Sequence, residues 1–286
     1  MRPRLIALFP NEKKASSIKI AKEICHFLKS QQIEVTCEER VAQQIDAIAL
    51  SEVEKNQIDF KISLGGDGTI LRLIHRHPDI QAPLLGINLG SLGFLADIPQ
   101  SMIYTGLKLL IEGRYQIEKR MMMEGQIEKE KSSFALNEIV LHRACNPCLV
   151  EIAIYVDGLY LNTFAADGII VSTPSGSTAY SLAAGGPILA PSLRAFVLTP
   201  ICPHTISNRP IVLMPNQKIE LKFLSQLAPI EVSYDGFTSF ALKTGEKCQI
   251  TPSAKELYLV NLENHDYFAT LREKLGWQGK LKHTLH

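Results

Sequence analysis

The chain has 286 residues, and its 30 basic and 29 acidic side chains leave a formal net charge of +1. This balance argues against a nucleic-acid binder that relies on a basic field. Hydrophobic residues make up 46% of the chain and charged residues 21%, which is typical of a globular protein. The length predicts about two domains.

Six cysteines are scattered along the chain, and Cys145 and Cys148 form its one CxxC pair. No second pair of this kind and no nearby pair of histidines accompanies it, so we expect thiols rather than a disulfide framework or a zinc site. The apolar run at residues 5–9 is too short for a signal peptide, and no stretch is long enough to span a membrane. We therefore expect a cytoplasmic protein.

Strand and helix patterns alternate over the first hundred residues. Short apolar runs predict buried strands, and apolar residues at helical spacing predict the helices that follow some of them. The expected strands are residues 5–9, 33–37, 60–64 and 83–87, and the expected helices are residues 13–30 and 69–75. This alternation predicts a Rossmann-like α/β domain, with a parallel sheet and helices on both faces.

The pattern changes to short strands near residue 115. Residues 149–156 alternate between apolar and polar, and Asp157-Gly158 then separates them from a second strand pattern at residues 159–164, which predicts a hairpin. Four more strands are expected at residues 218–224, 230–234, 240–243 and 256–261, and a helix at residues 267–277.

These patterns predict two domains of different class. We expect an α/β domain at residues 1–115 and a mostly β domain at residues 116–263. The last segment, residues 264–286, is expected to pack back on the first domain.

The stretch KISLGGDGTIL, residues 61–71, places three glycines and one carboxylate between a predicted strand and a predicted helix. A helix N-terminus presents free N–H groups and the positive end of the helix dipole. Glycines let such a backbone approach an anion closely. The loop therefore predicts a phosphate site, although it is not a P-loop, and Leu71 replaces the third glycine of a dinucleotide fingerprint.

Asp67 is unexpected in a loop that only binds phosphate, because a carboxylate repels phosphate groups. Its presence makes sense if it faces a hydroxyl group that must lose a proton, or a divalent cation that bridges the phosphates. A structural alternative is that Asp67 simply caps the following helix.

Four segments in order resemble the NAD kinase family. They are LGGDGTIL at residues 64–71, GINLGSLGFLAD at 86–97, LNEIVLHR at 136–143 and DGIIVSTPSGSTAYSLAAGGPIL at 167–189. The resemblance implies an α/β domain joined to a β-rich domain, as in the superfamily of phosphofructokinases and diacylglycerol kinases. It also implies transfer of the γ-phosphoryl group of ATP, or of polyphosphate, to the 2′-hydroxyl of the adenosine ribose of NAD.

The resemblance assigns roles to residues of this chain. Asp67 would be the catalytic base, the loop glycines and Arg72 would serve the phosphates, and polar residues of the second domain would bind NAD. Asn137 and Glu138 would bind its adenosine part and Asp167 its other end. The implied binding residues are Gly65, Gly66, Gly68, Arg72, Asn137, Glu138, Asp167, Thr178, Ala179, Tyr180, Ser181, Leu182 and Ala183.

Cofactor and partner expectations follow from the same resemblance. We expect a divalent cation such as Mg²⁺, held mainly by nucleotide phosphates and not by a protein metal site. NAD and ATP or polyphosphate are the expected substrates, and a homodimer or homotetramer the expected assembly. Two other functions are considered: a lipid or sugar kinase that shares the GGDGT loop, and a nucleotide-binding sensor without catalysis.

Overall fold

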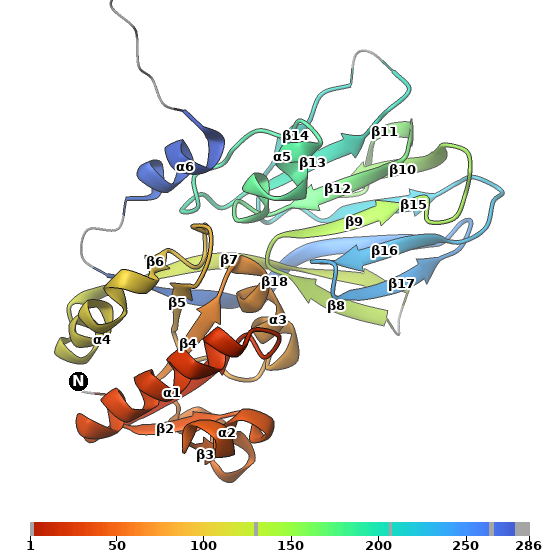
Figure 1. Ribbon diagram of the computed structural model, residues 1–286. Helices are drawn as coiled ribbons and strands as arrows, with labels where there is room; N and C mark the ends of the chain where they lie inside the picture. The colour runs from red at the N-terminus through yellow and green to blue at the C-terminus, as the bar shows by residue number, and fades with distance from the viewer. Residues whose placement is uncertain (1–2, 129–130, 206–207, 263–265, 278–286) are drawn as a thin grey trace, which may run out of the picture. The chain divides into compact units, whose positions relative to one another are not determined.

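The computed structural model describes residues 3–128, 131–205, 208–262 and 266–277 of the chain (Figure 1). Its packing divides the chain into two compact units. Unit 1 is Met1–Glu118 with Tyr258–His286, and unit 2 is Lys119–Leu257. The functional domains expected at residues 1–115 and 116–263, and the return of residues 264–286 to the first, stay predictions.

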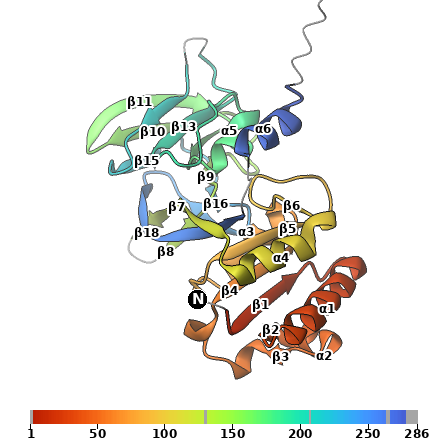
Figure 2. The same cartoon turned by 90° about the vertical axis from the view of Figure 1, so that its left-hand side faces the viewer.

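Unit 1 alternates strands and helices along the chain, as expected (Figure 2). Its strands are β1 (Leu5–Pro10), β2 (Glu34–Cys37), β3 (Ile48–Ala49), β4 (Phe60–Gly65), β5 (Leu84–Asn88) and β6 (Ile98–Pro99). Its helices are α1 (Ala15–Ser30), α2 (Glu39–Ile45), α3 (Asp67–Arg76), α4 (Ile103–Glu112) and α6 (Tyr267–Leu275), with 3-10 turns at Leu50–Glu52, Lys55–Gln57 and Gln100–Met102.

The parallel strands of unit 1 lie in the order β3-β2-β1-β4-β5. Side chains alternate between the two faces of a strand. Ile62 and Leu64 of β4 share a hydrophobic core with α1, α2 and α4. Gly65 of β4 and Gly86 of β5 lie on the opposite face of the sheet, next to Thr69 and Ile70 of α3. Helices therefore cover both faces, and α3 packs on the face opposite α1.

Unit 2 is an antiparallel β sandwich with one short α-helix, α5 (Tyr180–Ala183), and a 3-10 turn at Gly176–Thr178 among its described residues. One sheet has the order β14-β13-β12-β9-β16-β17, and the other contains β11-β10-β15 and the first part of β18. The strands are β7 (Tyr115–Ile127), β8 (Lys131–Ala135), β9 (Glu138–His142), β10 (Val150–Val156), β11 (Leu159–Ala166), β12 (Gly168–Ser172), β13 (Phe196–Ile201), β14 (Ile211–Leu213), β15 (Ile219–Phe223), β16 (Ile230–Tyr234), β17 (Thr238–Leu242) and β18 (Lys247–Leu262). Apolar residues from both sheets form one core.

Most predicted elements are present, and the largest differences lie in unit 2. The pattern at residues 256–261 proves to be the end of β18, a strand of 16 residues. Strands β12 and β13 were not predicted; β13 pairs on both sides and contains Pro200, a residue that argues against a central strand. Helices α2, α4 and α5 and strands β3, β6, β7, β8, β9 and β14 were also not predicted.

All six cysteines are free thiols, in agreement with the sequence-based expectation. Cys145 and Cys148 are exposed, and Cys25, Cys37 and Cys248 are buried. Among the described helices, none is long and apolar enough to cross a bilayer.

The core beneath the glycine loop can be tested by Ile62→Ala. Ile62 is fully buried in β4, so we expect the truncation to lower the free energy of unfolding by about 2–5 kcal/mol. Ile117 of unit 1 is 40% exposed, and Ile117→Ala is the matched control, with an expected loss below about 1 kcal/mol. Denaturant unfolding measures both, and equal losses would contradict the assignment of Ile62 to the core.

Candidate active site

The glycine loop of unit 1 is a direct strand-to-helix junction. Strand β4 ends at Gly65, Gly66 is the N-cap residue in an extended conformation, and α3 begins at Asp67. The helix thus begins two residues earlier than predicted. The first N–H groups of an α-helix have no intrahelical partner, so this junction presents backbone donors and the positive end of the helix dipole.

The three loop glycines are required for different reasons. A Cβ atom at Gly65 would lie 2.2 Å from Oγ1 of Thr69, so the absence of a side chain there permits close packing of strand and helix. A Cβ at Gly66 or Gly68 would meet nothing within 4 Å. These two glycines leave space open beside the helix N-terminus, as a close-fitting anion requires.

Asp67 does not cap α3, because no side-chain cap hydrogen bond is present at that helix. Its carboxylate instead accepts hydrogen bonds from three successive backbone amides of a neighbouring loop. Oδ2 accepts from Phe94 at 2.8 Å, and Oδ1 accepts from Leu95 at 3.1 Å and Ala96 at 2.9 Å. A carboxylate has about four acceptor positions, so one position on Oδ2 stays open.

The loop that holds Asp67 is itself fixed by close contacts. The side-chain amide of Asn88 donates to the carbonyl groups of Ser91 and Ala96, and its oxygen accepts from the amide of Gly90. A Cβ at Gly93 would lie 2.0 Å from Oδ1 of Asp67 and 3.0 Å from the carbonyl oxygen of Ala96. Gly93 is therefore a residue whose small size lets the carboxylate reach its three amides.

Arg72 lies on α3, beyond the glycine loop, and is half-buried. Together with Thr69 it lines a cavity of about 240 Å³ in unit 1. Gly65, Gly66, Asp67, Gly68 and Arg72 thus belong to the end of β4 and to α3, while their roles toward phosphate stay predictions.

In unit 2, Asn137 and Glu138 lie where β9 begins, and a second anchored carboxylate holds their backbone. Asp235 accepts hydrogen bonds from the amides of Leu136 at 2.7 Å, Asn137 at 2.8 Å and Glu138 at 3.0 Å. Asp235 was not among the predicted site residues, because Asp235-Gly236 shows only a turn signal in the sequence.

The carboxyl group of Glu138 is held away from water. Its Oε2 atom is buried and has no hydrogen-bond partner. Burial, together with the nearby charge of Asp235, raises the pKa of Glu138 to about 8, although a hydrogen bond from the backbone of Tyr180 acts in the opposite direction. At neutral pH the group is mostly protonated and can both donate and accept a hydrogen bond.

The turn after β12 packs against Asn137. The amide of Thr173 donates to the carbonyl group of Asn137 at 2.9 Å, and a Cβ at Gly176 would lie 2.1 Å from that carbonyl oxygen. The predicted residues from Thr178 to Ala183 continue this turn into α5, where the backbone of Tyr180 contacts Glu138. The structure therefore brings the Asn-Glu pair and the STAYSLA segment together.

Asp167 lies at the other end of the same strands. It precedes β12, where Gly168 pairs with His142, whereas Ser172 at the far end of β12 pairs with Glu138. Five residues of extended chain span about 17 Å. Asp167 forms an ion pair with Arg143, with Nε and Oδ1 2.9 Å apart, and Arg143 was not predicted as a site residue.

No group of three His, Cys, Asp or Glu side chains that could hold a metal ion occurs in the described part of the chain. The eight histidines and the CxxC pair thus supply no such cluster there. The polar groups at the glycine loop are backbone amides and a single carboxylate, and that carboxylate already accepts three hydrogen bonds.

A strand-helix junction with free backbone donors in an α/β unit, and a cluster of polar side chains in a β unit, fit the class of nucleotide-binding phosphotransferases. Residues 6–115 match the ATP-NAD kinase N-terminal domain, and residues 136–262 match the ATP-NAD kinase C-terminal domain. The chain belongs to the NAD kinase family.

Relatives and solved structures agree with this assignment. The chain is 66% identical to an NAD kinase of Protochlamydia amoebophila, over 97% of this chain and all of the relative. It is 36% identical to an NAD kinase of Geotalea daltonii, over 95% of this chain and 98% of the relative.

Two similar structures carry bound nucleotides. Yeast NADH kinase complexed with NADH has a TM-score of 0.89 at 28% identity. The match covers 100% of this chain and 91% of that chain. An NAD kinase from Archaeoglobus fulgidus in complex with ATP has a TM-score of 0.74 at 28% identity, with 96% of this chain and 98% of that chain covered.

The role of Gly93 can be tested by Gly93→Ala. The new methyl group would force the carboxylate of Asp67 to rotate away from its three amide donors. We expect a loss of stability of about 1–3 kcal/mol and faster amide hydrogen exchange at residues 94–96. Gly90→Ala is the control, because a Cβ there would make only an ordinary contact of 3.9 Å with Asn88. Unchanged exchange in Gly93→Ala would contradict this role.

The raised pKa of Glu138 predicts a pH dependence of stability. The unfolded carboxyl group loses its proton near pH 4.5 and the folded one near pH 8, so the folded state binds more protons between these values. Stability therefore falls as pH rises through this window. Glu138→Gln removes the titration, so we expect its stability relative to wild type to increase by at least about 1 kcal/mol from pH 5 to pH 8. Chemical denaturation at several pH values would detect this, and a pH-independent difference would contradict it.

Proposed function

We propose that this chain is an NAD kinase that transfers the γ-phosphoryl group of ATP to the 2′-hydroxyl of the adenosine ribose of NAD, which gives NADP. Family membership over nearly the whole chain supports this reaction. The observation that carries the mechanism is the open acceptor position on Oδ2 of Asp67, beside the N-terminus of α3.

In this mechanism Asp67 is the general base. The oxygen of the ribose 2′-hydroxyl forms a bond to the γ-phosphorus as the bond from that phosphorus to the bridging β-phosphate oxygen breaks. The hydroxyl proton passes to Oδ2 of Asp67 as the new bond forms, and ADP leaves. The three loop amides hold the carboxylate in one orientation, so its open position faces a fixed direction.

The backbone at Gly66 and Gly68 is proposed to bind the phosphates of the donor. Both positions are free of neighbouring atoms where a side chain would stand, and both adjoin the free N–H groups of α3. Preorganised backbone donors at a helix N-terminus stabilise the negative charge of a transferring phosphoryl group.

Unit 2 is proposed to bind NAD. Asn137 offers both donors and an acceptor to the edge of a base, and the protonated carboxyl group of Glu138 can bond ribose hydroxyls. Asp167, some 17 Å away along the strands, lies where an extended dinucleotide would place its other end. The residues from Thr178 to Ala183 would line this site.

A divalent cation, Mg²⁺ in the simplest case, is proposed to accompany the donor. It would neutralise phosphate charge, and substrate phosphates would supply most of its ligands. The residues present fit a cation held by the donor's phosphates, since the one open position of Asp67 serves the ribose hydroxyl and the described residues contain no cluster of three metal-binding side chains.

The other functions considered are not favoured. The match to the NAD kinase domains extends through residues 136–262, the part of the chain in which a lipid or sugar kinase would need a different acceptor site. The anchored base with an open position supports catalysis over a sensor that only binds nucleotides. We further propose a homodimer or homotetramer in the cytoplasm, a reducing compartment that suits six free thiols.

Asp67→Asn tests the proposed base. Its amide oxygen can still accept from Leu95 and Ala96, so most of the anchoring is kept while the basic group is lost. We expect kcat to fall by about three orders of magnitude or more, with the dissociation constant for NAD within a few-fold of wild type. Coupled detection of NADP and calorimetric titration of NAD measure the two quantities.

Amide exchange at residues 94–96 serves as the control for loop structure in this variant. Retained protection together with lost turnover supports chemistry at Asp67. Turnover near the wild-type value would reject its role as base.

A further inference from the structure

The exposed thiols of the chain all lie at one end of one sheet of unit 2. Cys145 and Cys148 belong to the loop between β9 and β10, and Cys202 directly follows β13. The last residues of β9 and β13 both pair with Gly168, the first residue of β12. Because neighbouring strands lie about 4.8 Å apart, the two chain segments leave the sheet about 10 Å from each other, on either side of Asp167.

Asp167 is bonded to both of these segments. Its amide donates to the carbonyl group of Ile201, the residue before Cys202, at 3.0 Å. Its carbonyl group accepts from the amide of Arg143 at 3.0 Å, and its carboxylate forms the ion pair with the guanidinium group of Arg143. The exposed thiols are therefore close in the fold to the residue that is proposed to bind the far end of NAD.

The residue after Cys145 holds Arg143 in position. Nη1 of Arg143 donates to the carbonyl oxygen of Asn146 at 2.6 Å. The side-chain amide of Asn146 donates in return to the carbonyl groups of Arg143 at 2.8 Å and Ala228 at 3.0 Å. Asn146 is only 4% exposed, and it lies between the two cysteines of the loop. The ion pair with Asp167 thus depends on the backbone that connects these cysteines.

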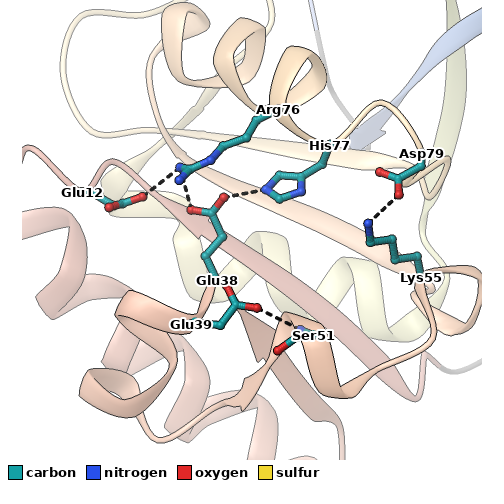
Figure 3. A network of polar contacts seen from close by, with 8 residues as sticks. All are labelled: Glu12, Glu38, Glu39, Ser51, Lys55, Arg76, His77 and Asp79. Atoms are coloured by element: carbon teal, nitrogen blue, oxygen red, sulfur yellow. Dashed lines mark hydrogen bonds and ion pairs between the residues drawn. The ribbon is translucent and has the colours of Figure 1, made fainter.

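The other three thiols are buried. Burial, and to a smaller extent the charge of Glu38, raise the pKa of Cys37 to about 12. An ion-pair network with α3 keeps the carboxylate of Glu38 in place (Figure 3). Burial likewise raises the pKa of Cys25, and that of Cys248 to about 12. Since the thiolate is the form that reacts with oxidants, these three thiols are protected and the exposed ones are not.

We propose that Cys145 and Cys148 are a redox-sensitive pair, and that their oxidation to an intramolecular disulfide weakens the binding of NAD. The inference rests on the proposed function, because it names a means of regulating the NAD site of that reaction. In a reducing compartment, a disulfide of this kind is transient and serves as a sensor.

The oxidant is a peroxide. The thiolate of one cysteine attacks an oxygen of hydrogen peroxide, the O–O bond breaks, and hydroxide leaves a sulfenic acid behind. The second thiolate then attacks that sulfur, and the S–S bond forms as the S–O bond breaks. Two thiols and one hydrogen peroxide molecule thus give one disulfide and two water molecules, and the two electrons that the sulfurs lose reduce the peroxide.

The disulfide would act on Asp167 through the turn that precedes it. The amide of Asn146 donates to the carbonyl group of Arg143 at 3.0 Å, so the hydrogen-bonded turn of the reduced loop is residues 143–146. A disulfide holds its two Cα atoms about 4.4–6.8 Å apart, which would draw residues 145–148 into a tight turn instead. This change moves Asn146 relative to Arg143, and Arg143 then no longer holds Asp167 in its present orientation.

Peroxide treatment of the full chain tests the site. After the remaining free thiols are blocked, mass-spectrometric peptide mapping should find a disulfide between Cys145 and Cys148, with Cys202 free. A disulfide that includes Cys202, or a loop that keeps both thiols while Cys202 is oxidised, would overturn the assignment.

Calorimetric titration of NAD tests the consequence. We expect the Kd for NAD to rise about fivefold or more on oxidation, and to return to its first value after reduction with dithiothreitol. Cys148→Ser should bind NAD as reduced wild type does, both before and after peroxide. Cys202→Ser removes the third exposed thiol of the same sheet end and is the matched control, which should respond as wild type does. A shift that persists in Cys148→Ser would reject the proposed pair.

Neither measurement needs turnover, so the two proposals can fail separately. Equal NAD binding by the reduced and the disulfide forms, in a chain that produces NADP, would overturn the redox control alone. Weakened NAD binding by the disulfide form, in a chain that produces no NADP from ATP and NAD, would overturn the proposed function alone.

Discussion

The site of unit 1 depends on one interaction, the hold of three consecutive backbone amides on the carboxylate of Asp67. This contact joins the start of α3 to the loop after β5. It requires a glycine at position 93, because a Cβ there would collide with the carboxylate. The side-chain hydrogen bonds of Asn88 hold the loop in the necessary shape. A carboxylate held in this way would need little reorganisation to act as the proposed base.

The α/β part of the fold could be predicted largely from its sequence. Buried parallel strands such as β1 and β4 are short apolar runs, and α1 carries its apolar residues at helical spacing. The central strands of the β unit were harder, since β13 contains Thr199 and Pro200 within its apolar residues and proline argues against a central strand. Pairing between distant segments, such as β9 with β12, leaves no local signal.

The glycine loop and its carboxylate were visible in the sequence because glycine and aspartate at such a junction have few uses. The direction of the Asp67 side chain was not, because its partners are backbone amides some 27 residues or more away. The same limit hid Asp235, whose partners lie almost a hundred residues earlier in the chain. Residue type predicts the chemistry of a side chain, while tertiary contacts decide what it anchors.

Both anchored carboxylates, Asp67 and Asp235, accept hydrogen bonds from main-chain N–H groups only. These bonds do not depend on which side chains the donor residues carry. Residues 94–96 are thus free, as far as this contact is concerned, to drift in size and polarity during evolution. Proline is the one amino acid that this contact forbids at all three positions, because it has no amide hydrogen to give. The same exclusion governs residues 136–138, so the two loops share a rule of substitution that no comparison of side-chain similarity would reveal.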